Sequence, residues 1–195
     1  MNAQPNLGMQ VTTFENPMGV DGFEFVEFAA PDPALLHELF RKLGFSAIAK
    51  HRTKQITLYR QGACNFLVNE EPDSFAADFA KTHGPSACGF AIRFRNPSDD
   101  TLRRVLANGA EEITHKSATK AVDVPVIKGI GGCMLYLVDR YGDKGDLYAQ
   151  EFDYLPSVDR HPRGFGLTFI NHPPASFTPI SGTGTVSTRT SLTPR

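Results

Sequence analysis

The stretch GFEFVEFAAPDPALLHELFRKLGF, residues 22–45, decides the fold because a second stretch repeats its pattern. Residues 89–110, GFAIRFRNPSDDTLRRVLANGA, again run from an apolar strand through a polar turn with proline to an amphipathic helix and then glycine. A pattern that recurs along a chain indicates a duplicated structural unit. We therefore expect two similar modules.

The first copy carries the local signals of this strand–turn–helix unit. Asp32 is a suitable N-cap, and Pro33 stands at the first helical position, where a missing N–H costs nothing. Gly44 provides the left-handed residue that ends a helix. The apolar helix residues are predicted to share one helical face: Leu35, Leu36, Leu39, Phe40 and Leu43.

Each unit reads as β-α-β-β-β, because RQGACNFLVN (60–69) matches GIGGCMLYLVD (129–139) in its glycine, its cysteine and its apolar run. A helix at 74–84 is expected to join the units. The fold class predicted is α+β, with two curved, mixed four-stranded sheets facing each other as one open barrel and helices outside. The strands are expected near 23–29, 45–51, 55–60, 64–69, 88–95, 111–116, 124–129 and 133–138, with a last strand in 146–155.

The remaining segments complete the predicted organisation. GFGLTFINH, residues 164–172, looks like the first strand of a third unit, and the Thr/Ser/Pro-rich stretch after it cannot bury enough apolar area to become ordered. We expect a flexible segment (1–14), a domain (15–156) with modules at about 22–70 and 87–155, a linker and incomplete strand (157–172), and a disordered tail (173–195).

Composition excludes several classes of protein. A formal net charge of −1 provides no electrostatic footprint for nucleic acid or an anionic membrane. No stretch approaches the roughly 20 apolar residues that span a bilayer, and the first residues do not form a signal peptide. Cys64, Cys88 and Cys133 fit neither a disulfide framework nor a metal knuckle, so we expect buried thiols in a reducing cytoplasm.

Most chemistry-bearing residues have ordinary interpretations. The glycines of KGIGG (128–132) precede a strand rather than a helix, which favours a hairpin turn over phosphate binding. His51, His83 and His115 stand near element ends, typical of surface or turn histidines. The sequence shows no catalytic pair in residues 1–160.

His172 is the candidate metal ligand. A histidine near the end of a module's opening strand points across the sheet's concave face, where two histidines and one carboxylate can hold non-haem Fe(II). The matching positions in the first two units are Phe28 and either Phe94 or Arg95, none of them a good ligand. A lone histidine is more often not a metal ligand, so the alternative that His172 binds no metal stays open.

Several long motifs resemble one enzyme family. The stretches are ENPMGVDGFEFVEFAAPDP (15–33), HRTKQITLYRQG (51–62), HGPSACGFAIRF (83–94), VIKGIGGCMLYLVDRYG (126–142) and FDYLP (152–156). They are similar to the amino-terminal half of bacterial 4-hydroxyphenylpyruvate dioxygenase, a member of the vicinal oxygen chelate superfamily. The resemblance implies an Fe(II)-dependent enzyme of tyrosine and phenylalanine breakdown that converts a 2-oxo acid substrate and O2 into homogentisate and CO2.

The resemblance also implies an incomplete site. In this family a His, His and Glu set lies in the carboxy-terminal barrel; FINHPP places His172 at the first ligand position, with Asn171 in place of Asp. The other ligands would lie beyond the match, so we expect a truncated or frameshifted form, poor iron binding, no catalytic or cofactor-binding residues and no activity.

Two alternatives remain open. One is a non-catalytic structural or oligomerisation domain, and the family commonly forms homo-oligomers. The other is a stand-alone dioxygenase, or a glyoxalase-type protein that assembles its site across a dimer. It would need His or Glu ligands in the first two units, and Phe28 argues against it.

Overall fold

The computed structural model describes residues 15–114 and 119–170, whose helices and strands all lie in one compact unit. The first half contains β1 (Val20–Ala29), α1 (Pro33–Lys42), β2 (Ser46–His51), β3 (Ile56–Gln61), β4 (Cys64–Asn69) and α2 (Phe75–His83). The second half contains β5 (Ser86–Phe94), α3 (Ser98–Ala107), β6 (Val126–Lys128), η1 (Ile130–Gly132), β7 (Met134–Val138), η2 (Gly142–Lys144), α4 (Leu147–Glu151) and β8 (Phe152–Tyr154).

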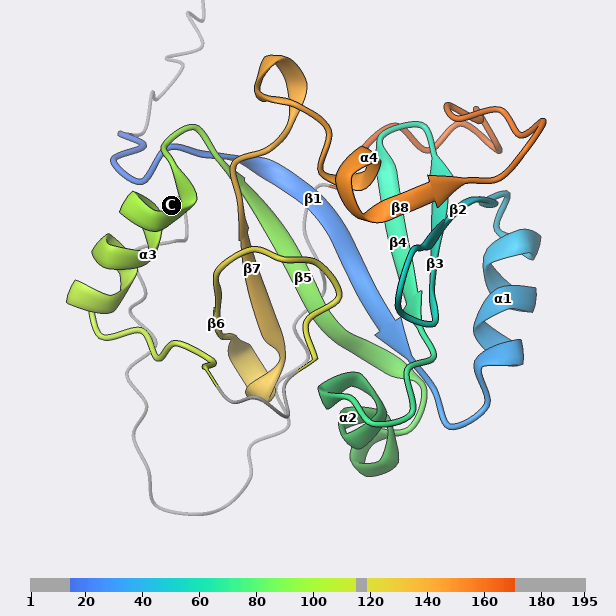
Figure 1. The fold of residues 1–195 in the computed structure, drawn as a ribbon, viewed down its shortest axis with the longest axis horizontal. Coiled ribbons are helices and arrows are strands. Elements are labelled where there is room, and N and C mark those ends of the chain that lie inside the picture. The colour runs from blue at the N-terminus through green and yellow to red at the C-terminus, as the bar shows by residue number, and fades with distance from the viewer. Residues whose placement is uncertain (1–14, 115–118, 171–195) are drawn as a thin grey trace, which may run out of the picture. The chain divides into compact units, whose positions relative to one another are not determined.

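The strands form one eight-stranded mixed sheet, which corrects the expectation of two four-stranded sheets (Figure 1). Its order is β6-β7-β5-β1-β4-β3-β2-β8. Within each half the first strand pairs in parallel with the last, β1 with β4 and β5 with β7, so the two halves share this strand pairing. The halves merge because β1 and β5 pair antiparallel from Val20↔Phe94 to Ala29↔Ser86.

Two predicted strands differ in the structure. Within 111–114, the described part of the expected strand 111–116, Glu112 makes only an isolated bridge to Ile127. The expected strand in 146–155 begins instead as α4, because the Asp146 carboxylate caps the helix by accepting from the Tyr148 N–H at 2.9 Å. Only Phe152–Tyr154 is extended, and it pairs with β2.

Residues 162–170, which we call the strap, are not a strand. Positive φ angles at Gly164 (52°) and Gly166 (97°) interrupt an extended path. The strap instead lies along the β3–β4 turn, where the N–H of Gly62 donates to Pro162 O and that of Ala63 to Thr168 O, both at 2.9 Å. The predicted flexible segment 1–14, His115, His172 and the tail 173–195 lie outside the described residues.

Helix α1 starts and ends as predicted, but three of the five apolar residues assigned to its apolar face are exposed. The Asp32 carboxylate accepts from the Ala34 N–H at 3.1 Å, and Gly44 has a φ of +84°. Leu36 and Phe40 are buried against the sheet. Only part of the predicted apolar face is buried, because three leucines remain 54%, 47% and 45% exposed: Leu35, Leu39 and Leu43.

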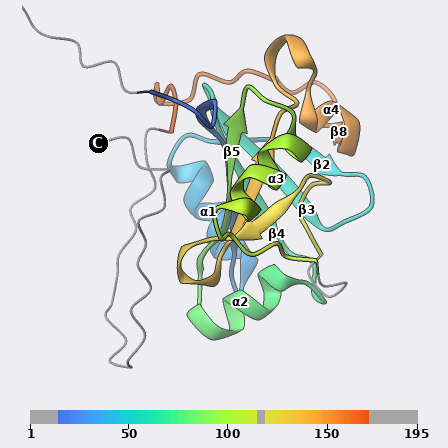
Figure 2. The same cartoon turned by 90° about the vertical axis from the view of Figure 1, so that its left-hand side faces the viewer.

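Each face of the sheet has its own hydrophobic cluster. The inner face carries Phe25, Leu58, Leu67 and Tyr136, and the 121–124 loop and α4 close over it. The outer face carries Tyr59 and Val68, which pack against α1. Figure 2 shows α1 and α4 on opposite sides of the sheet, in agreement with these clusters. Among the described helices, none combines the length and apolarity needed to cross a bilayer.

Candidate functional site

A buried carboxyl group lies at the centre of the inner face. Glu27, on β1, is 1% exposed. The Asn69 amide donates to Glu27 Oε1 at 2.7 Å, and the Tyr136 hydroxyl donates to Glu27 Oε2 at 2.7 Å. The Tyr136 oxygen in turn accepts from the Ala121 N–H at 3.0 Å. Strands β1, β4 and β7 thus bring together three polar side chains that are each separated by more than 40 residues.

The environment of Glu27 disfavours its charged form. Burial raises the pKa of its carboxyl above the usual 4.5, while the Asn69 and Tyr136 hydrogen bonds act in the opposite direction. Burial and the neighbouring Glu27 carboxyl also raise the pKa of the Tyr136 hydroxyl well above 10. A Cβ added at Gly89 would lie 2.8 Å from Glu27 Oε2, so protein atoms fill the space beside the carboxyl. The cluster is a closed network.

A second polar group surrounds Glu24 at another part of the inner face. Arg93 Nε lies 3.4 Å from Glu24 Oε2, and the Asn65 amide donates to the Glu24 carbonyl oxygen at 2.9 Å. Arg60 Nε donates to Asn65 Oδ1 at 2.7 Å. Burial is the main cause that raises the pKa of Glu24, opposed by the Tyr148 hydroxyl and the two arginines. Both inner-face carboxyl groups therefore already have protein partners.

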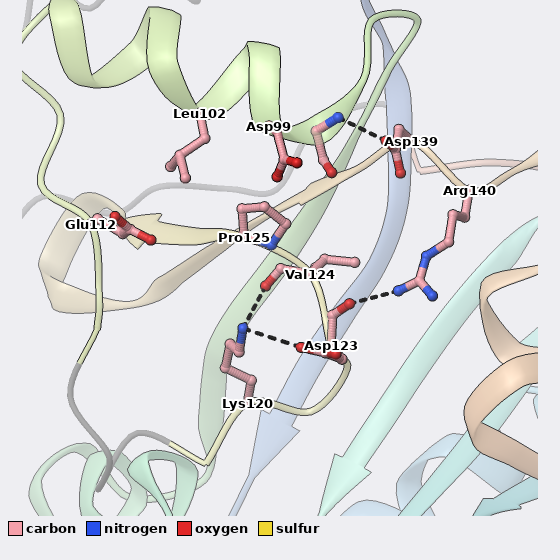
Figure 3. Close-up of a pocket in the computed structure, with 10 residues that line it drawn as sticks. Asp99, Leu102, Glu112, Lys120, Asp123, Val124, Pro125, Asp139 and Arg140 are labelled. Carbon is pink, nitrogen blue, oxygen red and sulfur yellow. Dashed lines mark hydrogen bonds and ion pairs between the residues drawn. The ribbon is translucent and has the colours of Figure 1, made fainter.

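An open depression lies between α3 and the 120–125 loop, with a volume of about 550 Å³ (Figure 3). Acidic residues line it beside Lys120 and Arg140. Lys120 Nζ donates to the Val124 carbonyl at 2.9 Å, and Arg140 donates to the Asp123 carbonyl at 2.7 Å (Figure 3). Asp139 accepts from the first N–H of α3, at Ser98, at 2.7 Å. These charges are used to fix the loop and the helix.

Sequence reasoning missed a third polar group, on the outer face. The hydroxyl of Tyr59 lies 2.8 Å from His37 Nδ1, and His37 Nε2 lies 3.1 Å from Glu70 Oε2. Tyr59 is 4% exposed, so its hydroxyl is not presented to a substrate. The group links α1 to β3 and to the residue after β4. Its members are 11 or more residues apart, and no short motif could have identified them.

The histidines singled out in the sequence have structural contacts where they are described. His51 Nδ1 accepts from the backbone N–H groups of Thr53 and Lys54 at 3.1 and 3.2 Å, as a turn histidine does. The ring of His83 packs on that of Phe79 at 4.3 Å between centroids.

The predicted orientation of Phe28 is wrong. Phe28 packs on the outer face against Phe40 and Phe66, because side chains alternate along β1 and Phe28 directly follows the inward-facing Glu27. The inner-face position near the end of β1 therefore belongs to Glu27. The sequence analysis assigned this inner-face position to Phe28, whereas the structure has the acidic residue Glu27 there.

The described residues do not fit an iron centre. Within 15–114 and 119–170, no group of three or more His, Cys, Asp or Glu side chains could hold a metal ion. The two inner-face carboxyl groups are engaged by Asn69, Tyr136 and Arg93. Their surroundings therefore provide no open coordination positions for a 2-oxo acid and dioxygen.

Comparison with known proteins identifies close relatives of this domain. The family model described as "Hydroxyphenylpyruvate dioxygenase, HPPD, N-terminal" matches residues 14–153. The 4-hydroxyphenylpyruvate dioxygenase of Pseudomonas sp. (strain P.J. 874) is 47% identical over 159 residues, which are 82% of this chain and 44% of the relative. Hemolysin VllY of Vibrio vulnificus (strain CMCP6) is 48% identical over 162 residues, 80% of this chain and 45% of the relative.

A solved structure shares the fold. A xylose isomerase-like TIM barrel/4-hydroxyphenylpyruvate dioxygenase fusion protein superposes with a TM-score of 0.62 and 34% identity, covering 70% of this chain and 22% of that one. The open, eight-stranded mixed sheet with α1 to α4 is thus a glyoxalase-like, vicinal oxygen chelate fold. The chain spans less than half the length of the two curated relatives.

Proposed function

The chain belongs to the hydroxyphenylpyruvate dioxygenase family through that family's amino-terminal domain, and from this premise we propose that it is the scaffolding half of such an enzyme. The complete enzyme would convert 4-hydroxyphenylpyruvate and O2 into homogentisate and CO2 in the cytoplasm, within tyrosine and phenylalanine breakdown. Identity of 47% to a relative named 4-hydroxyphenylpyruvate dioxygenase supports this assignment.

One observation carries the scaffolding role: the inner face of the sheet is filled. Phe25, Leu58, Leu67 and Tyr136 pack beneath the 121–124 loop and α4, and Glu27 is sealed among its partners. A site for a 2-oxo acid on Fe(II) needs open space and free ligands. We therefore place the iron and substrate in the other half of the enzyme, with His172 as this chain's proposed contribution.

The test uses the 195-residue chain, supplied with Fe(II), 4-hydroxyphenylpyruvate and O2. We expect no homogentisate by chromatography, and iron far below one equivalent after desalting. As the positive arm, residues 1–170 are joined to the carboxy-terminal part of the Pseudomonas sp. relative, and this chimera should form homogentisate. Turnover with near-stoichiometric iron in the chain alone would contradict the scaffolding role, and a folded but inactive chimera would contradict the dioxygenase assignment.

A matched variant tests Glu27 separately. Glu27→Gln in the chimera should leave its iron content unchanged, because Glu27 bonds only protein groups. Loss of iron from a folded variant would identify Glu27 as a ligand and move the site into this half.

A second candidate is an oligomerisation domain without a catalytic partner. The apolar side chains that remain exposed on α1 and the strap favour it, since such surfaces mark interaction sites. Light scattering after size exclusion distinguishes the two: a stable dimer of the chain alone favours this candidate, and a monomer at all concentrations contradicts it.

A further inference from the structure

The ring of His51 holds the turn between β2 and β3 through one of its nitrogen atoms. His51 Nδ1 accepts from the N–H groups of Thr53 and Lys54 at 3.1 and 3.2 Å. A ring nitrogen that accepts hydrogen bonds carries no proton, so the single proton of the neutral imidazole is on Nε2. The side chain is 5% exposed. The turn therefore fixes the tautomer of His51.

A second proton on this ring has no favourable place. It would bind at Nδ1, where it would face the N–H groups of Thr53 and Lys54 and break both hydrogen bonds. Burial is the main cause that lowers the pKa of His51 below the usual 6.5, and the Lys54 ammonium adds to it. Glu151, whose Oε2 lies 3.6 Å from His51 Nε2, and Glu71 act in the opposite direction. The closed turn therefore requires a neutral ring.

The residues around His51 also fasten the loop that covers the inner face of the sheet. Lys54, whose N–H bonds the His51 ring, donates from Nζ to the Lys120 carbonyl at 2.7 Å. Glu151, which lies beside His51 Nε2, accepts from the Asp123 N–H at 3.0 Å with each of its carboxylate oxygens. A rearrangement of the turn would therefore disturb two of the attachments of the loop.

That loop, residues 120–125, seals the inner face. Ala121 and Val122 are fully buried among the apolar residues of this face. The Ala121 N–H donates to the Tyr136 hydroxyl at 3.0 Å, and this hydroxyl donates to Glu27 at 2.7 Å. Release of the loop would therefore admit water to the carboxyl network beneath it.

We propose that His51 is an acid-sensitive latch: its protonation opens the turn after β2 and releases the 120–125 loop, while the rest of the sheet stays folded. The open form takes up the second proton more readily than the closed form, so acid shifts the equilibrium toward the open form. The closed form keeps its full stability above pH 6.5 and loses it as the pH falls, by up to about tenfold in population for each pH unit.

The test is hydrogen–deuterium exchange of the 195-residue chain at about pH 7.5 and about pH 5.5, read by mass spectrometry and corrected for the pH dependence of intrinsic exchange. His51→Asn is the decisive variant, because its side-chain oxygen accepts from turn N–H groups as Nδ1 does but takes up no proton. His83→Gln, which removes a histidine on α2, is the control. Glu27 titrates in all three proteins, so the difference between them isolates His51.

We expect the protection of residues 120–125 to fall about five- to tenfold further in the wild type than in His51→Asn between the higher and the lower pH. His83→Gln should behave as the wild type does, and β1 should change equally in all three proteins. The same change in the wild type and His51→Asn would overturn the proposal. A loss of protection that extends through β1 in the wild type would also overturn it, since the opening would then be global.

A second measurement needs no variant, so it decides the question even if His51→Asn does not fold. Long-range ¹H–¹⁵N spectra of the histidine rings report which nitrogen is protonated and the pH at which each ring titrates. We expect the His51 proton on Nε2 and a titration below pH 6.5 that coincides with the loss of protection in the loop. A proton on Nδ1, or a ring that titrates while the loop stays protected, would contradict the latch.

Discussion

Replacing Tyr136 by phenylalanine should destabilise the fold strongly, because one hydroxyl serves two buried groups. It donates to Glu27 Oε2 at 2.7 Å and accepts from the Ala121 N–H at 3.0 Å. A hydrogen bond to a charged group contributes about 1.5–3 kcal/mol, and an unsatisfied buried N–H costs about 1–3 kcal/mol. We expect Tyr136→Phe to lower the free energy of unfolding by about 3–5 kcal/mol, a large share of the roughly 5–15 kcal/mol of a typical domain.

The assay is urea unfolding followed by far-UV circular dichroism, since the chain has no tryptophan. With a slope of about 2 kcal/mol/M, the midpoint should fall by roughly 2 M. Tyr154→Phe is the matched control, because its hydroxyl bonds Asp146 at an exposed site and should contribute less than about 1 kcal/mol. In a Glu27→Gln background the cost of Tyr136→Phe should shrink. A loss equal to that of the control would refute the reasoning.

Three further changes test other parts of the structure. Burial raises the pKa of Glu27, so the folded state binds the carboxyl proton more tightly and loses stability as the pH rises above 4.5. In urea titrations from pH 4.5 upward, the unfolding free energy of Glu27→Gln should increase relative to that of the wild type by up to about 1.4 kcal/mol per pH unit. A difference between the two proteins that does not change with pH would contradict this. Leu36→Ala should cost about 2–5 kcal/mol, whereas Leu39→Ala should change the unfolding free energy by no more than about 0.5 kcal/mol. Gly62→Ala places a Cβ 2.2 Å from a strap carbonyl oxygen and should speed proteolysis of the strap, while Gly84→Ala, with nothing within 4 Å, should not.

Local signals in the sequence predicted most elements correctly. The Asp32 cap, the Gly44 stop and the apolar residues of β1 act within a few residues, so they can be recognised from the sequence. The family resemblance was also correct, since its motifs spread over most of residues 15–156.

The remaining errors come from distant partners. One sheet forms instead of two because β1 and β5, whose paired residues are 57 to 74 positions apart, pair along their length. Periodicity placed the five apolar residues of α1 on one face, but it could not show that only Leu36 and Phe40 would be buried. Alternation along β1 places Glu27 on the inner face and Phe28 on the outer face, and which face would line the inner cluster depended on strands far along the chain. The residue pattern of one segment does not predict which strand or surface will pack against that segment.

The pairing of β2 with β8 has a consequence for synthesis on the ribosome. Phe152 joins His51 across 101 residues, so β2 has one free edge until almost the whole domain has been translated. At about 5–20 residues per second, that interval lasts roughly 5–20 s. A nascent chain with an open strand edge is a template for pairing with its neighbours on the same messenger. The fraction of newly made chain that reaches its native state should therefore depend on the rate of translation and on whether a chaperone covers the first module.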